Sequence, residues 1–458
     1  MKVMKRCAAV LIVVALMFSA FGCKSSETQT GELDEGYVPD VSGKVTITYQ
    51  LATTEIAKKS VTQYVTAFEK QYPNVKVTTD FSKGDTALRI SSGDIGDVFF
   101  LWETDVYNYA SVNQALMPLD SYVEAFDIDL SNVYSSVLDF GRVDGQLYMI
   151  ARDYNHLVMQ YNKDAVVAEG LTDPVELEAQ DAWTWDTFKD YCAALTKSDG
   201  GFYTQVGASL RCAYAPVYIP FLEGWGGTWY DNVNKKITLY SDEKVLDGVN
   251  EMLAAIDTGT VYCEDHAGLN IYQGEKATPY SKLVANDVAQ FVFQDVEFPM
   301  LETVGYAYDS YDIDWNIVSM PKFPTHKVGA GATGFAVYNK TNNPDAAAAL
   351  CLFLMSEDGQ TAYNGAEGGS VPNVKALADS DFWKVPFDPE VINYDAFTSY
   401  PEADTRGLIE LCVPPDIAKI VSEGLENLAK NHINGIKSAE DTLKEVEEQA
   451  NQLWTTLS

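Results

Sequence analysis

Residues 44–81 read KVTITYQLATTEIAKKSVTQYVTAFEKQYPNVKVTTDF, and their apolar residues follow first one regular spacing and then another. From Val45 to Leu51, apolar side chains occupy every second position, which is typical of a β-strand. From Val61 to Tyr72 they recur at helical spacing, and Pro73 ends the predicted helix. Alternation returns from Val75 to Phe81, so the stretch predicts a strand, a helix and a second strand.

The same order of elements continues along the chain. The apolar run from Val98 to Trp102 predicts a buried third strand. Repeated strand–helix alternation indicates an α/β fold with a largely parallel sheet. Further on, Thr184 and Ser438 are expected to cap helices, and Asn343 is expected to cap a helix that begins at Pro344. A chain of 458 residues is too long for a single core and predicts two domains.

The first 22 residues have the pattern of an export signal. Three basic residues precede an apolar stretch from Ala8 to Phe21, which is too short to span a bilayer. The stretch ends at Ala20-Phe-Gly-Cys23, which resembles a bacterial lipobox except at Phe21. We therefore expect residues 1–22 to be removed, Cys23 to carry lipid, palmitate included, and residues 23–43 to form a flexible tether on the outer face of the cell membrane.

Charge and cysteine content narrow the possible partners. Removing residues 1–22 leaves 29 basic and 66 acidic residues, a net charge of −37. Such a surface argues against nucleic acid as a partner, although acidity also serves solubility. The five cysteines after Cys23 are widely spaced and odd in number, with no CxxC pair for zinc or redox chemistry. We expect Cys192 and Cys351, which lie in apolar helical patterns, to be buried thiols.

Several segments, taken together and in this order, resemble the family 1 extracellular solute-binding proteins. The matching segments are Phe68–Val77, Gly96–Trp102, Leu116–Asp120, Tyr161–Asp164, Trp183–Phe188, Trp225–Gly227, Leu239–Ser241, Trp315–Pro321, Gly331–Val337, Asn343–Ala346 and Phe353–Glu357. Each segment is weak evidence alone, but their order and spacing from about residue 44 onward are specific.

The resemblance implies a periplasmic-binding-protein type II fold, with two α/β lobes and a ligand cleft between them. By analogy, the chain crosses between lobes near Asp153, Val328 and Val371. Lobe one would comprise residues 44–153 and 328–371, and lobe two residues 154–327 and 372–458. The function implied is capture of a carbohydrate, most simply an oligosaccharide, and its delivery to the transmembrane permease of an ABC importer. The binder would be a monomer, not an enzyme, and need no cofactor.

Ligand-binding residues are expected where strands of an open sheet end. Aromatic rings stack on the faces of a sugar, and charged side chains bind its hydroxyls. The candidates follow predicted strands, lie at the first crossing, flank Gly226-Gly227 or lie in the irregular stretch 380–407, which we interpret as cleft loops. They are Thr53, Glu55, Trp102, Glu103, Asp105, Asp153, Tyr154, Trp225, Trp229, Tyr400 and Arg406. Trp383 is instead expected in the core.

Other functions are less well supported by the residues. Gly329–Gly334 matches GxGxxG, but a strand is predicted after it rather than the helix that a dinucleotide site requires. The histidines are isolated, and Asp127, Asp129 and Asn132 lack the glycine and final glutamate of a calcium loop, so no metal site is predicted. A surface glycan hydrolase, a non-transport adhesin or sensor, and a cationic or peptide ligand stay open as alternatives.

Overall fold

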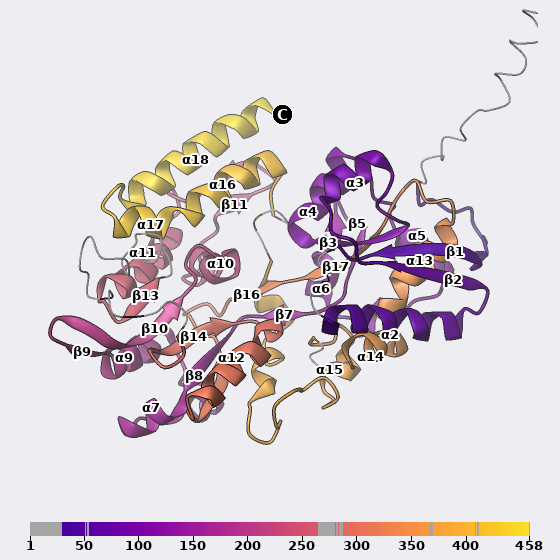
Figure 1. Ribbon diagram of the computed structural model, residues 1–458. Coiled ribbons are helices and arrows are strands. Elements are labelled where there is room, and N and C mark those ends of the chain that lie inside the picture. The colour runs from indigo at the N-terminus through magenta and orange to yellow at the C-terminus, as the bar shows by residue number, and fades with distance from the viewer. Residues whose placement is uncertain are drawn as a thin grey trace, which may run out of the picture.

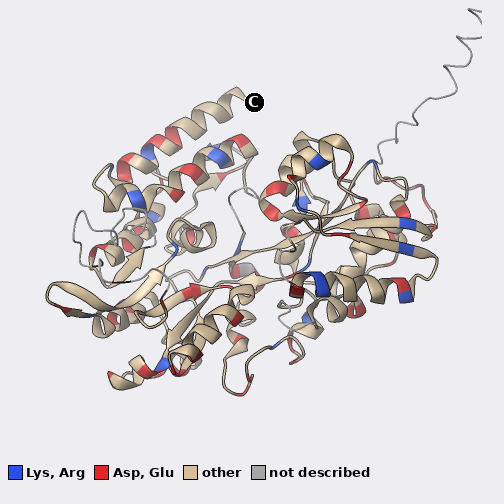
Figure 2. Cartoon of the chain, in the orientation of Figure 1, with Lys and Arg blue, Asp and Glu red and all other residues tan. Residues whose placement is uncertain are grey.

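The computed structural model describes residues 30–50, 52, 55–263, 280, 283, 287–365, 370–407, 409 and 412–457. The chain forms two α/β lobes that lie side by side (Figure 1). Acidic residues are spread over both lobes rather than gathered on one of them (Figure 2). Within these described ranges, no helix has both the length and the hydrophobicity needed to cross a bilayer.

The first lobe is built on a five-stranded sheet in the order β2-β1-β3-β17-β6. Its strands are β1 (Gly43–Thr48), β2 (Val75–Asp80), β3 (Val98–Trp102), β6 (Met149–Ala151) and β17 (Thr333–Val337). Strands β2, β1 and β3 pair in parallel, whereas β17 is antiparallel to β3 and β6. The predicted strands are therefore confirmed, and β17 follows the GxGxxG match, as expected.

Most helices of this lobe bury apolar residues in its core, although the helix Thr86–Ser92 buries none. In α2 the buried residues include Val61, Tyr64 and Phe68, at the spacing that predicted the helix. The helices are α2 (Glu55–Gln71), α3 (Thr86–Ser92), α4 (Glu103–Tyr107), α5 (Asp120–Ala125), α6 (Ser135–Asp139), α13 (Pro344–Leu352), α14 (Glu357–Asn364) and α15 (Lys375–Ala378). A small hairpin joins β4 (Arg142–Val143) to β5 (Gln146–Leu147).

The prediction for Asn343 is wrong in one respect. The helix does begin at Pro344, but the side chain of Asn343 makes no capping hydrogen bond. Its Nδ2 instead donates to the carbonyl oxygen of Lys44 at 2.9 Å, which ties this helix to the first strand. By contrast, Thr184 and Ser438 cap their helices as expected, and each accepts a backbone N–H from the third residue after it.

The second lobe has a sheet in the order β13-β10-β14-β8-β15, with β9 (Lys197–Asp199) paired to β10. Its strands are β8 (Val158–Asn162), β10 (Phe202–Leu210), β13 (Val261–Cys263), β14 (Phe291–Val296) and β15 (Trp315–Ser319), with a separate hairpin of β11 (Tyr230–Asp231) and β12 (Lys236–Ile237). Its helices are α7 (Lys163–Ala168), α8 (Pro174–Ala179), α9 (Trp185–Leu195), α10 (Ala215–Glu223), α11 (Glu243–Asp257), α12 (Phe298–Ser310), α16 (Pro415–Glu426), α17 (Leu428–Ile433) and α18 (Ala439–Thr456).

A narrow ribbon connects the lobes. It consists of β7 (Asn155–His156), β16 (Val328–Gly331) and β18 (Thr405–Arg406), in the order β18-β16-β7. In Figure 1, β16 and β7 run between the two sheets at the centre of the molecule. The backbone N–H of Tyr154 also donates to the carbonyl oxygen of Val371 at 3.2 Å, so four distant segments of the chain meet here. We call β7, β16 and β18 the hinge ribbon.

Glycines let the hinge ribbon pack closely on lobe two. A Cβ atom added to Gly329 would lie 1.9 Å from the carbonyl oxygen of Pro216 in α10, which no side chain could tolerate. Glycine at this position therefore permits the close approach of the two backbones. The five described cysteines form no disulfide, and both Cys192 and Cys351 are buried, as predicted.

The stretch 380–407 differs from its interpretation as a set of cleft loops. Four of its six aromatic side chains are buried, namely Trp383, Tyr394, Phe397 and Tyr400, and both Trp383 and Phe397 contact the ring of Phe298 in α12. Burial of these large apolar rings stabilises the packing of the segment on lobe two. The predicted core position of Trp383 is confirmed, and the other aromatics of the stretch serve the same purpose.

Candidate functional site

The side of the site that belongs to lobe one is formed where β3 ends and α4 begins. Trp102 is 48% exposed, and its ring packs edge-on against Phe100. Glu103, the next residue, is only 5% exposed. Its Oε1 would lie 3.1 Å from a Cβ atom placed on Gly331 of the hinge ribbon, so a glycine leaves room for the carboxyl group. One residue therefore offers a flat ring, and its neighbour places a carboxyl group against the hinge.

Lobe two contributes polar side chains from the loop before α10 and from the start of α12. The hydroxyl of Tyr214 donates a hydrogen bond to Glu297. The Arg211 guanidinium lies 4.4 Å from the centre of the Tyr214 ring, and its Nε donates to Asp295 Oδ2 at 2.6 Å. Its Nη2 lies 3.8 Å from Glu297 Oε1. These contacts hold Arg211, Tyr214 and Glu297 in one arrangement.

The two sides meet at Gly331. The Tyr214 hydroxyl lies 4.0 Å from the same Cβ position that is 3.1 Å from Glu103 Oε1. Residues from both lobes and from the hinge therefore surround one point. We call Glu103, Asp153, Arg211, Tyr214 and Glu297 the cleft floor.

The charges of the cleft floor are only partly balanced. Arg152 Nη2 pairs with Asp153 at 2.9 Å, and Arg211 pairs with Asp295, so each cation already has a carboxylate. Burial, reinforced by negative Asp153 and Glu297, raises the pKa of Glu103 to about 8. Burial likewise raises the pKa of Glu297. At neutral pH Glu103 is therefore mostly protonated and can donate as well as accept a hydrogen bond.

Two buried polar atoms of the cleft floor have no hydrogen-bond partner in the described part of the chain. They are Oε2 of Glu103 and Nη2 of Arg211. A buried polar atom without a partner costs free energy, about 1–3 kcal/mol, unless a water molecule or a ligand satisfies it. One comes from each lobe, so a polar molecule between the lobes would satisfy both.

Asp153 and Tyr154 lie at the first crossing, as expected, but they are inside the hinge. Asp153 is fully buried and accepts the backbone N–H of Thr333 at 3.2 Å. The Tyr154 hydroxyl, also buried, forms hydrogen bonds with Ser136 at 2.8 Å and Thr405 at 3.0 Å. Tyr154 thus joins chain segments and does not present its ring to a ligand. The negative charge of Asp153, by contrast, acts on Glu103, the neighbouring residue of the cleft floor.

The two candidate tryptophans of lobe two differ in exposure. Trp225 is partly buried, and its ring packs against Phe323 at 5.1 Å. Trp229 is 1% exposed, and its Nε1 donates to Glu223 Oε1 at 3.3 Å. Arg406 binds the other oxygen of the same carboxylate. Trp229, Glu223 and Arg406 line a cavity of about 680 Å³ at the C-terminal end of α10.

The remaining candidates are not brought to the cleft floor. Tyr400 is buried, and its hydroxyl donates to the carbonyl oxygen of Leu157 at 3.2 Å. Glu55 is exposed at the start of α2 and pairs with Lys58 at 2.8 Å. Asp105 lies in the first turn of α4, where burial and nearby Asp85 raise its pKa. Thr53 lies outside the described residues.

Arg211, Tyr214 and Glu297 were missed by sequence reasoning. They belong to no motif, and only the three-dimensional fold places them opposite Glu103. The available signal was positional, because Arg211 follows β10 directly and Glu297 follows β14 directly. The rule that ligands bind beyond the carboxyl ends of strands would have selected both if it had been applied to lobe two.

A second cavity spans the gap between the lobes. It has a volume of about 410 Å³, and Tyr107 and Arg142 line it from lobe one. Asn232, Lys235 and Trp454 line it from lobe two. Asn232 also lines the 680 Å³ cavity beside Arg406, so the two cavities adjoin. Their combined extent exceeds what a single small solute needs.

Two α/β lobes on a thin hinge, with a polar floor contributed by both lobes, define a two-lobed binding protein. The model of the bacterial extracellular solute-binding protein family matches residues 52–361, and the chain belongs to this family. The family consists of exported binding proteins rather than enzymes, so the activity of the site is binding.

Solved structures with the same fold include two with sugar-like ligands. An ABC substrate-binding protein from Listeria monocytogenes, in complex with cycloalternan, is 17% identical with a TM-score of 0.67, over 90% of this chain and 99% of that one. The GacH receptor of Streptomyces glaucescens, solved unliganded and with acarbose, is 18% identical with a TM-score of 0.68, over 91% and 99%. The sugar-binding protein MalE from Xanthomonas citri is 14% identical with a TM-score of 0.68, over 90% and 98%.

Proposed function

We propose that this protein captures a carbohydrate, most simply an oligosaccharide, in the cleft between its lobes and delivers it to the permease of an ABC importer. The observation that carries the proposal is the pair of unpartnered buried atoms, Glu103 Oε2 and Arg211 Nη2, beside the half-exposed ring of Trp102. A sugar has hydroxyls for the first two and an apolar face for the third. The cycloalternan and acarbose complexes of similar structures support the same ligand class.

Capture would work by closure of the lobes as a monomer. Glu103 belongs to one lobe and Arg211 to the other, so only the closed state can bind a ligand from both sides. A ligand shifts an open–closed equilibrium by its differential affinity for the two states. We propose hinge positions near Asp153, Val328 and Val371, with lobe one formed by residues 44–153 and 328–371 and lobe two by residues 154–327 and 372–458. The exception is α15 (Lys375–Ala378), which stays with lobe one, where the preceding Val374 pairs with Val133.

The adjoining cavities favour an oligosaccharide over a monosaccharide. The 680 Å³ and 410 Å³ cavities share Asn232 and extend from the hinge ribbon towards the gap between the lobes. Arg406 and Trp229 in the first cavity would contact units of the ligand beyond the one on the cleft floor. Trp229 would need to turn from its buried position to stack on a sugar.

A thermal-shift screen against mono- and oligosaccharides tests the proposed function. A ligand that binds only the native state raises the free energy of unfolding by mass action, by about 2.7 kcal/mol at a ligand concentration of a hundred times its Kd. The melting temperature rises as a result. We expect one oligosaccharide class to raise it and to be recovered unchanged. Recovery of cleaved sugar, or a shift only with peptides or polyamines, would contradict the proposal.

We also propose that lipid on Cys23 anchors the protein to the outer face of the membrane, through the residues that directly follow it. The expected tether of residues 23–43 is too long, because Tyr37 and Asp40 both bind the Asp345 carboxylate of α13 and so belong to lobe one. Tethering raises the effective concentration of the binder near its permease. The mass of the mature N-terminal peptide tests this directly, since it should contain a lipidated Cys23. In the variant Cys23→Ala the protein should move from the membrane fraction to the medium. An unmodified N-terminal peptide would show simple secretion instead.

A further inference from the structure

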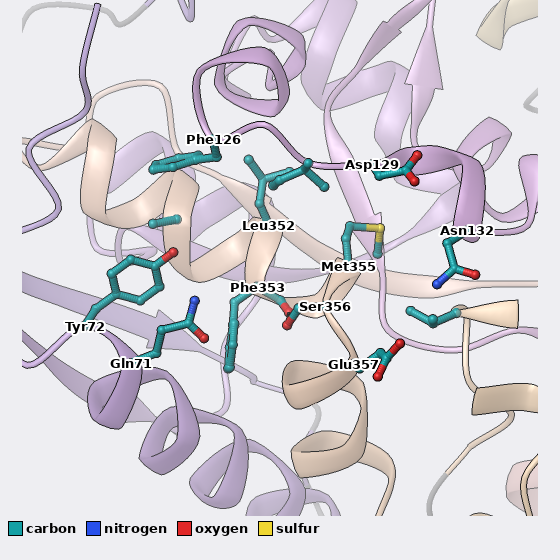
Figure 3. A pocket seen from close by; sticks show the side chains of 13 residues that line it. Gln71, Tyr72, Phe126, Asp129, Asn132, Leu352, Phe353, Met355, Ser356 and Glu357 are labelled. Atoms are coloured by element: carbon teal, nitrogen blue, oxygen red, sulfur yellow. Dashed lines mark hydrogen bonds between the residues drawn. The ribbon is translucent and has the colours of Figure 1, made fainter. Parts of the chain in front are cut away.

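Lobe one contains a separate cavity of about 340 Å³, remote from the cleft (Figure 3). Its walls come from the end of α2, the segment after α5, and the turn between α13 and α14, which contains the 3-10 helix η5 (Phe353–Met355). No residue of the cleft floor or of the hinge ribbon lines it. A cavity of about 150 Å³ holds a benzene ring, so this one can hold a ring with a short side chain.

One end of the cavity is apolar and rigid. Tyr72, Phe126 and Phe353 surround it in Figure 3. Phe353 is 5% exposed and packs against Phe68 at 5.6 Å, and Phe68 in turn packs against Tyr72 at 4.8 Å. These rings are fixed by the core of lobe one, so a ligand would not have to order them on binding.

The other end of the cavity is negatively charged. Asp129, Asn132 and Glu357 line it, on the side opposite the aromatic rings (Figure 3). The hydroxyl and the backbone N–H of Ser131 bind the Asp129 carboxylate and lower its pKa, so the group is ionised at neutral pH. The thirteen lining residues include no Lys, Arg or His. Within the described ranges, no side-chain cation lies within 4.0 Å of Asp129 or Glu357, although the protein forms many ion pairs elsewhere.

We propose that this cavity is a second ligand site, which takes a small organic cation with one ring, such as an arylalkyl amine. The ring would lie among Tyr72, Phe126 and Phe353, and the ammonium between Asp129 and Glu357. Aromatic walls and uncompensated carboxylates at opposite ends match the two ends of such a molecule. A bare metal ion fits less well, because two carboxylates and one amide fall short of the six to eight oxygens that calcium takes. The site does not depend on the function of the cleft.

Calorimetric titration of the purified protein with tyramine tests the proposal, with 2-(4-hydroxyphenyl)ethanol as the matched uncharged probe. Tyramine should bind at one site, and the alcohol at least about tenfold more weakly. Glu357→Gln and Asp129→Asn should each weaken tyramine binding about threefold to fivefold, as expected for ion pairs at exposed carboxylates. Asp358→Asn, the adjacent exposed carboxylate of the same helix turn, lies outside the cavity and should change nothing.

Three results would overturn the proposal. The first is the absence of tyramine binding. The second is an equal loss in Asp358→Asn and Glu357→Gln, which would indicate attraction to an acidic surface rather than a site. The third is loss of tyramine binding in Trp102→Ala, which would place the amine in the interlobe cleft. Persistence of binding in Trp102→Ala supports a separate site, whatever the outcome of the carbohydrate screen.

Discussion

Trp102 and Glu103 show how adjacent residues at the end of one strand take different tasks. The strand β3 is buried until its last residue, and α4 begins immediately after it. The ring of Trp102 is left half exposed, while the carboxyl group of Glu103 turns inward to the hinge. Sequence reasoning selected both residues because they follow a predicted strand, but it could not give their opposite exposures.

Removal of the exposed ring should weaken ligand binding far more than it weakens the fold. In Trp102→Ala, affinity for the carbohydrate found in the screen should fall at least about tenfold. The free energy of unfolding should fall by no more than about 1.5 kcal/mol, because the ring is already half exposed and its aromatic contact is the edge-on one with Phe100. Calorimetry and urea denaturation measure the two quantities. Trp102→Phe should retain most of the affinity, and Tyr306→Ala, an exposed ring on α12, should retain all of it.

Protonation of Glu103 should make stability depend on pH. Its pKa is about 8 in the folded protein, above the usual carboxyl value, so the folded state binds more protons than the unfolded state at neutral pH. The free energy of unfolding should therefore fall as pH rises from 6.5 to 8, by up to about 1.4 kcal/mol per unit from this group. Burial lowers the pKa of His156 to about 4, so that group does not titrate in this window.

Urea denaturation at several pH values compares the protein with Glu103→Gln. The glutamine keeps the size of the side chain but cannot ionise, so the fall of stability with pH should be shallower. Parallel pH profiles for the two proteins would contradict the inward, buried position of Glu103.

At the scale of elements, periodicity predicted most of lobe one. The spacing of apolar residues predicted β1, α2, β2 and β3. Each of these elements buries one or both of its faces, and the positions of its apolar residues in the sequence follow that burial. Helix N-caps were predicted correctly at Thr184 and Ser438, whose side chains bind the backbone of their own helices. Asn343 was misassigned because a distant carbonyl, that of Lys44, competes for its amide.

The local sequence pattern did not predict which side chains are buried where contacts with distant segments determine burial. From the sequence alone, the aromatic side chains between residues 380 and 407 could have faced either a ligand or the core. In the structure, Phe298 of α12 contacts Trp383 and Phe397, so these rings belong to the core. Trp229 and Tyr400 were expected to face a ligand for the same reason and are buried here. In contrast, Arg211 and Glu297 are separated by 86 positions in the sequence, and no local signal brings them together.

The contact of the hinge ribbon with α10 should be intolerant of a single methyl group. In Gly329→Ala the new Cβ would overlap the carbonyl oxygen of Pro216, so backbone must move and the free energy of unfolding should fall by about 1–3 kcal/mol. Gly331→Ala, on the same strand, would meet side chains rather than backbone, Glu103 at 3.1 Å and Tyr214 at 4.0 Å, and should cost less. Equal losses in the two variants, measured by denaturation, would argue against this tight packing.

At the scale of the whole molecule, the two sheets and the hinge ribbon explain why the proposed binding would require both lobes. Lobe one supplies the exposed ring and Glu103, lobe two supplies Arg211, Tyr214 and Glu297, and the hinge supplies the glycine that lets them meet. The resemblance seen in the sequence gave the two-lobed architecture, and the family match supports it. The identity of the ligand depends on side chains that only the assembled lobes bring together.

Closure on a carbohydrate is tested most directly by the distance between the lobes. Spin labels at Leu88→Cys on α3 and Val233→Cys beside β11, both exposed, report on opposite sides of the cleft in a Cys412→Ser background (Figure 1). With the carbohydrate that raises the melting temperature, we predict a shorter and narrower distance distribution and recovery of the intact sugar. An unchanged distribution at saturating sugar, or recovery of cleaved sugar, would contradict a binding protein that closes on its ligand.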